Sequence, residues 1–574
     1  MEIFPWVCYN DFQINEGMKQ SMENYPNYPL RNEKNMRTML ASAKEAYGGR
    51  DMLRVRTKEK TVRGIGAEEF LRDMNALGNA LLGLGLADAH IAVVGPTSYE
   101  WLLTYYAVLC GVGVIVPVDK ELPDDEIANI LEDSGAQALV FSPEYGDTVE
   151  NIRGGLPGVK YYIDMHAGED GKGTHGFRKL IREAEACGYE QREIDENAMS
   201  ALLYTSGTTG KSKGVMLTQK NILSASEGGL SLLDLGQVCM SVLPVHHSFE
   251  STHGITMMIQ NGTTICVNDS LRHFMQNLQL FKPDTLCLVP LFVEMMHRKI
   301  WQNAERDGQA DALRGLLRKS NEELRRGEDN RGKYFKNIHD AFGGNLKLII
   351  CGGAPLSARL MREFREFGIL LLNGYGITEC APLVSVNKNR YYCDGAVGIP
   401  IACCDVKVEN ADEDGDGEIW VKGPNVMLGY YKNEEGTKEV MKDGWFNTGD
   451  IGRIDGGGFL HITGRKKNLI VLSNGKNIYP EEIEEYLMRI PYIKEVVVYA
   501  PLTDGLNETE LCAEIFVAEE YSAGRSAREI EENLEKDISA VNKTLPTYKH
   551  IGRFHVRGRE FEKTTKKSIK RFAM

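Results

Sequence analysis

A segment rich in glycine and hydroxyl side chains, residues 204–214 (YTSGTTGKSKG), is the strongest chemical feature of the sequence. Its glycines allow the backbone to turn N–H groups towards an anion, its threonines and serines offer hydroxyl donors, and Lys211 and Lys213 add positive charge. Only two residues separate Gly207 from Gly210, whereas a Walker A loop has four residues between its glycines. We therefore expect the segment to hold a polyphosphate, with a flexible surface loop as the alternative.

A second set of polar residues, 373–379 (NGYGITE), follows the apolar run GILLL and so lies just past the end of an expected strand. Ligands bind at that end of the strands in open α/β sheets. Tyr375 offers a flat face for a base, Thr378 a hydroxyl group, and Glu379 a hard oxygen ligand that suits Mg²⁺. The run 351–355 (CGGAP) ends another expected strand in the same way. An ordinary structural turn is the alternative for both.

A third set, residues 445–450 (WFNTGD), ends on a carboxylate that suits a sugar. Asp450 can accept hydrogen bonds from both hydroxyl groups of a ribose, although an aspartate in an ordinary turn is the alternative. The basic run 464–470 (GRKKNLI) follows it.

These motifs occur in one order over roughly 260 residues, and together the sequence resembles the adenylate-forming superfamily of acyl-CoA synthetases, peptide-synthetase adenylation domains and luciferases. The resemblance extends from about residue 35 to the end of the chain and is closest to bacterial long-chain and medium-chain fatty acyl-CoA ligases. It implies a large α/β domain of mixed and parallel sheets flanked by helices, with a small β-barrel-like subdomain, followed by a small mobile α+β domain.

The resemblance also implies a role for individual residues. The β and γ phosphates of ATP are expected at Thr205, Ser206, Gly207, Thr208, Thr209, Gly210 and Lys213, and the adenine at Gly353, Ala354, Pro355, Asn373, Gly374 and Tyr375. Thr378 is expected at the α-phosphate, Glu379 at Mg²⁺, and Asp450 and Arg465 at the ribose. Lys467 corresponds to the hinge of the mobile domain, and Gly475, Lys476 and Asn477 would face the thiol donor.

The implied reaction has two halves. A carboxylate attacks the α-phosphorus of ATP, pyrophosphate leaves, and an acyl-adenylate forms; a thiol then displaces AMP to give a thioester. Charge builds on the phosphoryl oxygens in the first half, so catalysis consists mainly of positioning and of stabilisation by Mg²⁺ and lysine. Coenzyme A is the expected thiol, and an acyl carrier protein is the alternative acceptor.

The C-terminal motif departs from the family pattern. The family's adenylation lysine belongs to a motif of the type K-T-x-x-G-K-I-x-R, and residues 563–571 (KTTKKSIKR) place Ser568 at the catalytic position. Serine cannot supply the charge. We expect Lys567, or alternatively Lys566, to reach the site through a shifted loop, because a long side chain can absorb a displacement of one residue. A homologue that binds nucleotide but has lost catalysis is the third possibility.

Two parts of the sequence bear on the nature of the acid. The run 243–250 (LPVHHSFE) resembles the family's L-P-L-x-H-x-x-E motif, which places His247 on the way to the acyl site, although a buried core histidine is the alternative. In family members, the apolar runs at 254–259 and 289–296 would line an apolar pocket for the acid. Such a pocket suits a fatty or aryl acid better than an amino acid, whose ammonium group needs a buried carboxylate.

The elements that must position these residues follow from the hydrophobic pattern. A helical pattern at 67–85 and short Val/Ile-rich runs at 90–95, 113–118 and 138–143 alternate, which is typical of a parallel sheet covered by helices. The charged stretch 302–337 is expected to be solvated helix and connection, and 393–463 a β-rich subdomain. We expect an N-terminal domain at 1–463 and a C-terminal cap at 464–574.

Composition and charge disfavour some classes of function. The 574 residues carry 67 Lys and Arg against 81 Asp and Glu, a formal charge of −14, which disfavours general nucleic-acid binding. A basic cluster at 549–571 leaves three interpretations: nucleic-acid binding, a solvated face, or contacts with ATP and coenzyme A phosphates.

Scattered cysteines and the lack of a signal peptide or transmembrane run favour a cytoplasmic protein. The acidic run 412–417 resembles half of an EF-hand, but Gly423 replaces its final glutamate, so a hairpin turn is expected.

Overall fold

The chain divides into two compact units in the computed structural model, which describes residues 24–171, 173–185, 192–205, 212–472, 476–503, 506–507, 510–563, 569 and 571. Among the described residues, the larger unit comprises 24–406 and 421–446, and the smaller unit comprises 407–420 and the residues from 447 onwards. The predicted domains 1–463 and 464–574 and the hinge at Lys467 stay predictions.

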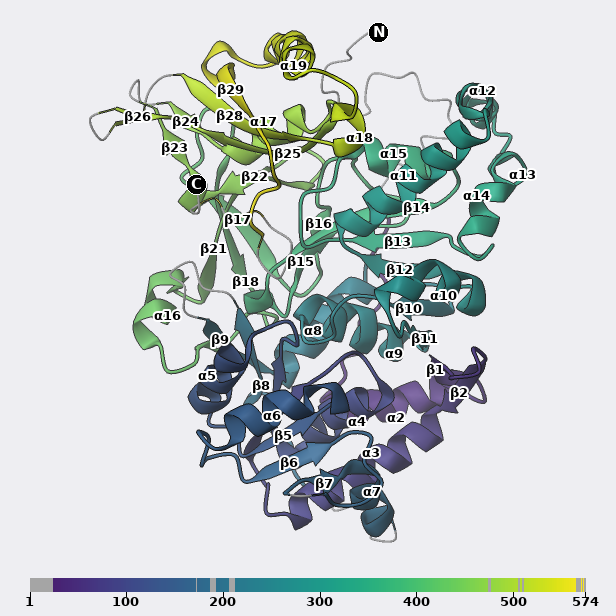
Figure 1. Ribbon diagram of the computed structural model, residues 1–574. Helices are drawn as coiled ribbons and strands as arrows, with labels where there is room; N and C mark the ends of the chain where they lie inside the picture. Colours follow the sequence, from purple (N-terminus) through teal and green to yellow (C-terminus); the bar gives the residue numbers. More distant parts are fainter. Residues whose placement is uncertain are drawn as a thin grey trace. The chain divides into compact units, whose positions relative to one another are not determined.

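The larger unit contains a nine-stranded sheet whose central strands run parallel (Figure 1). In spatial order its strands are β16 (Ile399–Pro400), β15 (Leu383–Val386), β14 (Leu370–Gly376), β13 (Leu348–Cys351), β12 (Thr285–Leu288), β10 (Val238–Ser241), β11 (Thr264–Val267), β1 (Asp51–Arg56) and β2 (Val62–Gly66). The strands β10 to β13 are buried along almost their whole length, as expected of parallel strands that are covered on both faces.

An eight-stranded sheet forms the second layer of strands in this unit. Its order is β19 (Gly429–Tyr430), β9 (Lys213–Thr218), β8 (Met199–Thr205), β4 (Gly113–Val118), β3 (Ala89–Val94), β5 (Ala138–Phe141), β6 (Tyr161–Asp164) and β7 (His175–Gly176). The strands from β8 to β7 in this order run parallel, whereas β9 returns antiparallel to β8. The alternation of helix and Val/Ile-rich strand predicted between residues 67 and 143 is confirmed.

Helices cover both sheets of the larger unit. They are α2 (Met36–Tyr47), α3 (Ala67–Gly83), α4 (Tyr99–Ala107), α5 (Asp124–Ser134), α6 (Gly146–Arg153), α7 (Phe177–Glu185), α8 (Gln219–Leu230), α9 (Met257–Asn261), α10 (Phe274–Phe281), α11 (Pro290–Arg306), α12 (Ala310–Arg325), α13 (Arg331–Tyr334), α14 (Lys336–Ala341), α15 (Ala358–Glu366) and α16 (Glu434–Val440). The helix α8 contacts strands β8 and β9 of one sheet and β15 of the other, so it lies between the two sheets. Its first turn is closed by a capping box of Thr218 and Asn221.

The stretch 302–337 differs from the prediction that it is solvated. The helix α12 has an amphipathic spacing, and its Leu317 packs into the core that surrounds β12 and β13 together with Phe335 and the partly buried Leu313 and Leu316. The predicted helix and connection are confirmed, and only the full solvation was wrong, because a high density of charge on one face of a helix is compatible with an apolar stripe on the other.

This correction predicts a stability effect. Replacing Leu317 by alanine is expected to lower the free energy of unfolding by about 2 kcal/mol, because the substitution leaves a cavity in a packed core. The exposed Arg318→Ala change on the same helix is the control and is expected to stay within about 0.5 kcal/mol of wild type. Urea unfolding of both variants measures the difference, and equal midpoints would mean that α12 is only a solvated helix.

The smaller unit is built around short sheets. A five-stranded sheet in the order β17 (Asp405–Glu409), β18 (Gly417–Lys422), β21 (Trp445–Ile454) and β20 (Met441–Lys442), with β22 (Leu460–Arg465) beside β21, contains the points at which the chain passes between the units. A three-stranded sheet of β25 (Ile493–Tyr499), β28 (Leu511–Val517) and β29 (Ile551–Arg557) shares a core with α17 (Pro480–Leu487) and α19 (Ala527–Asn542). The remaining short elements are β23 (Ile470–Val471), β24 (Asn477–Ile478), β26 (Leu502–Thr503), β27 (Leu506–Asn507) and α18 (Glu519–Ser522).

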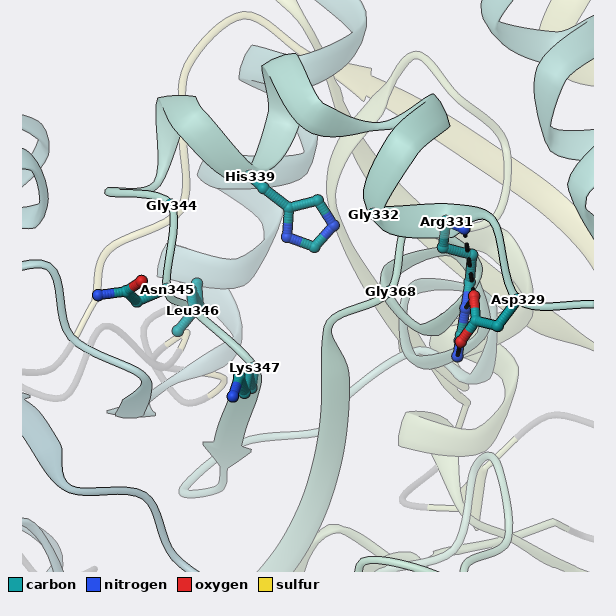
Figure 2. A pocket seen from close by; sticks show the side chains of 9 residues that line it. All are labelled: Asp329, Arg331, Gly332, His339, Gly344, Asn345, Leu346, Lys347 and Gly368. Atoms are coloured by element: carbon teal, nitrogen blue, oxygen red, sulfur yellow. Dashed lines mark hydrogen bonds and ion pairs between the residues drawn. The ribbon is translucent and has the colours of Figure 1, made fainter.

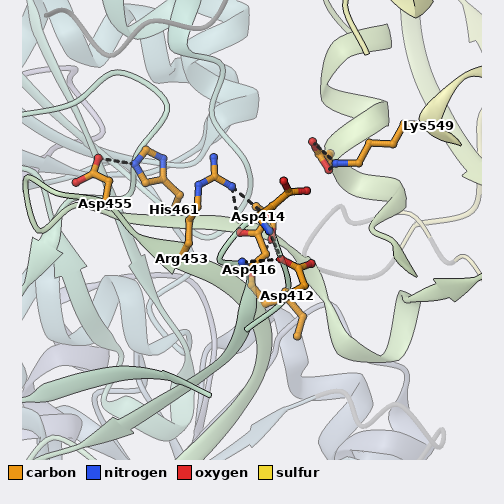
Figure 3. Close-up of polar contacts among 10 residues, drawn as sticks. Asp412, Asp414, Asp416, Arg453, Asp455, His461 and Lys549 are labelled. Carbon is orange, nitrogen blue, oxygen red and sulfur yellow. Dashed lines mark hydrogen bonds and ion pairs between the residues drawn. The ribbon is translucent and has the colours of Figure 1, made fainter. Parts of the chain in front are cut away.

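The acidic run between β17 and β18 forms a hairpin turn, as predicted (Figure 3). The carboxylate of Asp412 accepts the backbone N–H groups of Asp414 and Asp416, each at 3.0 Å. Asp416 in turn receives two hydrogen bonds from Arg453 at 3.0 and 3.2 Å. Asp412 and Asp416 therefore have partners within the turn and on the neighbouring strand. These contacts explain why acidic residues occur in the turn, without a calcium ion.

The basic C-terminal cluster is largely paired with acids of the same unit. The ion pairs join Lys549 to Glu482, Arg553 to Glu510, Arg557 to Glu514, Lys563 to Glu495 and Glu560, and Arg571 to Glu481 and Glu484. Five of the nine Lys and Arg residues of the cluster 549–571 thus have their charge balanced nearby. The helices of the described residues include none that is long and apolar enough to cross a membrane.

Candidate functional site

Two of the predicted clusters meet at the carboxyl edge of the nine-stranded sheet. The strands β13 and β14 run parallel in a register that places Cys351 beside Asn373, so residues 353–355 leave the sheet next to the predicted adenine residues 373–375. Gly353 adopts a φ of +82°, in the left-handed region that favours glycine, and Gly353, Ala354 and Pro355 are exposed. The structure therefore brings together residues that lie about 20 positions apart.

Asn373 is the buried polar centre of this edge. Its backbone oxygen accepts the N–H and the side-chain NH₂ of Asn387 at 3.1 and 3.0 Å, which ties β14 to the neighbouring segment. The residue is 3% exposed, and within the described part of the chain its side-chain oxygen Oδ1 has no hydrogen-bond partner. A buried acceptor without a donor costs free energy. The exocyclic amino group of an adenine is a donor of the kind that such an oxygen lacks, so the residues here fit a nucleotide base.

Tyr430 links the predicted phosphate residue Lys213 to the predicted metal ligand Glu379. The ammonium group of Lys213 lies 4.9 Å from the centre of the Tyr430 ring, and the Tyr430 hydroxyl donates to Glu379 Oε1 at 2.9 Å. Burial and the neighbouring carboxylate of Glu379 both raise the pKa of Tyr430, so its hydroxyl stays protonated and remains a donor. The second carboxylate oxygen of Glu379 has no hydrogen bond among the described residues, and one such oxygen together with phosphate oxygens suits Mg²⁺.

The antiparallel strands β8 and β9 flank the segment that is predicted to bind the phosphates. Thr205 ends β8 and pairs with Lys213, which begins β9. The segment between them, with the predicted residues Ser206, Gly207, Thr208, Thr209 and Gly210, lies outside the described residues. Tyr204 donates to Asp133 at 2.5 Å, which ties the end of β8 to helix α5.

The loop that carries His247 reaches the same edge. It leads from β10 to the π-helix η3 (Phe249–Thr256), and Ser248 donates to the hydroxyl of Thr378 at 3.4 Å. The rings of His246 and His247 lie 4.1 Å apart at an angle of 55°, and His246 lies 3.3 Å from Asp119. Burial would raise the pKa of Asp119, but the adjacent His246 and the charge of His247 outweigh it and lower that pKa to about 2.

The remaining predicted residues belong to the smaller unit. Asp450 and Arg465 lie opposite each other on β21 and β22 and form an ion pair at 2.7 Å, with the Asp450 side chain 2% exposed. Burial and the charge of Arg465 lower the pKa of Lys467. Lys476 is exposed and lies 5.5 Å from the centre of the Tyr548 ring, and Asn477 pairs with Val471 between β24 and β23.

Several predicted residues of the smaller unit lie outside the described residues, namely Gly475, Lys566, Lys567 and Ser568. The ends of their segment are described: Lys563 pairs with Ile569 in an antiparallel bridge, and Arg571 is held by Glu484 and Glu481 of helix α17. The motif is therefore anchored on both sides of the lysines in question.

Sequence reasoning missed Tyr430 and Ser248 as members of the candidate site. The available signal for Tyr430 was weak, because the pair Tyr430 and Tyr431 after a glycine is also typical of a strand end. Ser248 lies within the run 243–250, which was read for its histidine alone. Neither pairing can be found from sequence spacing, since 51 positions separate Tyr430 from Glu379 and 130 separate Ser248 from Thr378.

A separate hollow of about 420 Å³ lies at the opposite, amino-terminal edge of β13 and β14 (Figure 2). Among its lining residues, Arg331 is bound to Asp329, and His339 lies 2.9 Å from the carbonyl oxygen of Phe367. None of the predicted site residues lines it. We therefore assign the site to the carboxyl edge, where the polar residues of separate motifs converge.

Comparisons with known proteins identify the family of the chain. A family model described as "AMP-binding enzyme" matches residues 51–431, and one described as "AMP-binding enzyme C-terminal domain" matches residues 467–574. The chain belongs to the AMP-binding enzyme family.

Individual proteins are similar to this chain. The chain is 30% identical to the long-chain-fatty-acid–CoA ligase FadD15 of Mycobacterium bovis over 447 residues, which cover 74% of this chain and 72% of that protein. The structure of the anthranilate CoA ligase AuaEII in complex with anthranoyl-AMP matches with a TM-score of 0.76 at 19% identity, covering 95% of this chain and 97% of that one. ATP-bound MatB from Rhodopseudomonas palustris matches with a TM-score of 0.73 at 22% identity, covering 94% and 98%. The two structures share the fold.

Proposed function

We propose that the protein activates a carboxylic acid with ATP to an acyl-adenylate and pyrophosphate, and then transfers the acyl group to coenzyme A with release of AMP. The observation that carries the proposal is the series of contacts from Lys213 through the ring of Tyr430 to Glu379, together with the buried acceptor of Asn373 at the carboxyl edge of the nine-stranded sheet. Membership of the AMP-binding enzyme family and a relative named as a fatty-acid–CoA ligase support it.

The described residues have separate roles in the first half-reaction. Asn373 and Tyr375 bind the base, and Lys213 binds the β and γ phosphates together with the segment that follows Thr205. Glu379 would hold Mg²⁺, which when bound neutralises charge that builds on the phosphoryl oxygens. Thr378, oriented by Ser248, donates to the α-phosphate.

The smaller unit supplies the remaining contacts in this proposal. Asp450 accepts the ribose hydroxyl groups while Arg465 holds its carboxylate in place. Lys467 is the hinge residue, Lys566 or Lys567 supplies the adenylation charge, and Gly475, Lys476 and Asn477 face the thiol.

A fatty acid is the proposed substrate class. The run 254–259 is completely buried, and Met257, Met258 and Ile259 lie in the core beside the loop that carries His247. The run 289–296 contributes less than expected, because Leu291 and Met295 are 51% and 44% exposed. The name of the relative from Mycobacterium bovis supports the same class.

A pyrophosphate-release screen tests the proposal. Fatty, aryl and amino acids are supplied with ATP, with and without coenzyme A, and a matched set contains a phosphopantetheinylated carrier protein. We expect release with fatty acids and formation of acyl-CoA. Turnover with the carrier protein alone would favour the carrier-charging alternative. ATP binding without pyrophosphate exchange would favour the impaired homologue that Ser568 suggests.

A further inference from the structure

The loop that carries His247 and Ser248 is closed at its base by one buried carboxyl group. The loop, residues 242–249, leaves the end of strand β10 and enters the π-helix η3, where Glu250 is fully buried. π-Helical turns are often found at functional sites. Because Glu250 has no access to solvent, it can act only through the residues that it contacts inside the protein.

Glu250 binds both ends of the loop. The Ser241 hydroxyl, at the end of β10, donates to Glu250 Oε1, and the backbone N–H groups of Val242 and Leu243 face the same carboxyl group. At the other end, the backbone N–H groups of Glu250 and Ser251 both donate to the His247 carbonyl oxygen at 3.0 Å. A single residue therefore joins the first and the last turn of the loop.

The space around the carboxyl group is restricted. A Cβ atom at Gly254 would lie 2.4 Å from Glu250 Oε2, so glycine at this position leaves room for the carboxyl group to reach back to β10. Burial raises the pKa of Glu250 to about 8, although the bonds from Ser241, Val242 and Leu243 lower it, so the group is mostly neutral at pH 7. The pKa of Cys239, on β10, is raised mainly by its contact with Cys287 and by burial, and the charge of Glu250 adds to this rise.

We propose that Glu250 is a positioning residue that holds the loop 242–249 and thereby places His247 and Ser248 at the acyl side of the candidate site. The consequence for activity rests on the proposed function, whereas the consequence for the loop does not. Ser248 is the link to the reaction, because its hydroxyl donates to Thr378 at 3.4 Å.

Four variants separate this role from a general loss of stability. Glu250→Ala removes the carboxyl group, Glu250→Gln keeps a neutral acceptor of the same shape, and Gly254→Ala displaces the carboxyl group by contact. Thr256→Val is the matched control: Thr256 is buried in the same π-helix, lies 2.9 Å from the Tyr106 hydroxyl and donates to the Ser251 carbonyl oxygen at 2.8 Å, so the change removes side-chain hydrogen bonds of η3 and leaves the bonds of Glu250 to the loop in place.

Hydrogen–deuterium exchange of the full chain tests the loop directly. We expect Glu250→Ala and Gly254→Ala to raise exchange of peptides from residues 242–249 at least 10-fold over wild type, while Glu250→Gln and Thr256→Val leave it within about twofold. As the pH rises from 5 to 8, the Tm of wild type is expected to fall relative to that of Glu250→Gln, because the buried carboxyl group loses its proton. Equal exchange in Glu250→Ala and Thr256→Val would overturn the proposal, whether or not the protein proves to be a ligase.

Steady-state kinetics then test the consequence for activity. In wild type that releases pyrophosphate with a fatty acid, Glu250→Ala is expected to raise the KM for the acid about 10-fold with an unchanged KM for ATP, and Glu250→Gln is expected to restore it. An inactive wild type would refute the proposed function while the exchange result still decides the loop. A Glu250→Ala variant with normal KM for the acid would refute the positioning role.

Discussion

Replacement of Glu379 by glutamine is expected to lower the rate of pyrophosphate release about 100-fold or more and to raise the Mg²⁺ concentration needed for half-maximal rate. Glutamine keeps the shape and one carbonyl oxygen but removes the negative charge that attracts a divalent cation. The side chain would still accept the hydrogen bond from Tyr430, so the change isolates the charge. Pyrophosphate release over a Mg²⁺ titration measures both effects.

Tyr430→Phe is the matched control for this experiment. It removes the hydroxyl that donates to Glu379 at 2.9 Å but keeps the ring against which Lys213 packs. We expect a loss of no more than about 10-fold, because the carboxylate keeps its charge and loses only one positioning contact. If Glu379→Gln retains the wild-type rate and Mg²⁺ dependence, Glu379 is not the metal ligand, and the carboxyl edge needs another.

Replacement of Lys567 by alanine is expected to lower acyl-adenylate formation about 100-fold or more, while transfer from a chemically supplied acyl-adenylate to coenzyme A continues. The expected loss reflects the removal of a positive charge from the phosphoryl oxygens, which Ser568 cannot replace. Pyrophosphate release measures the first half-reaction, and acyl-CoA formation from supplied adenylate measures the second.

Lys566→Ala is the internal comparison, since it removes a neighbouring cation from the same segment. We expect it to change pyrophosphate release by less than about fivefold, and a reversed order of effects would assign adenylation to Lys566. Normal release in both variants would refute the role of either lysine. Arg571 would be unaffected by these changes, because Glu484 and Glu481 hold it at the far end of the segment.

Local patterns in the sequence were enough to predict much of the fold. The helix α3 and the strands β3, β4 and β5 follow from the alternation of a helical period with short buried runs, because each signal is contained within one element. Leu317 shows the limit of such reasoning. The charges around it suggested solvent, and only the packing of α12 against the core reveals that one face is buried.

By itself, the sequence determined the family, the order of the motifs and the kinds of side chain that the chemistry needs. Those features depend on residue type and on short spacings along the chain, and the amino-acid sequence contains both directly. Only the tertiary structure decided which of these side chains meet. The register of β13 and β14 places residue 353 near Asn373, the return of Tyr430 to the sheet edge gives Glu379 a donor, and the reach of Glu250 back to Ser241 closes the loop that carries His247. Such contacts join residues through space, and their partners follow from strand order and packing.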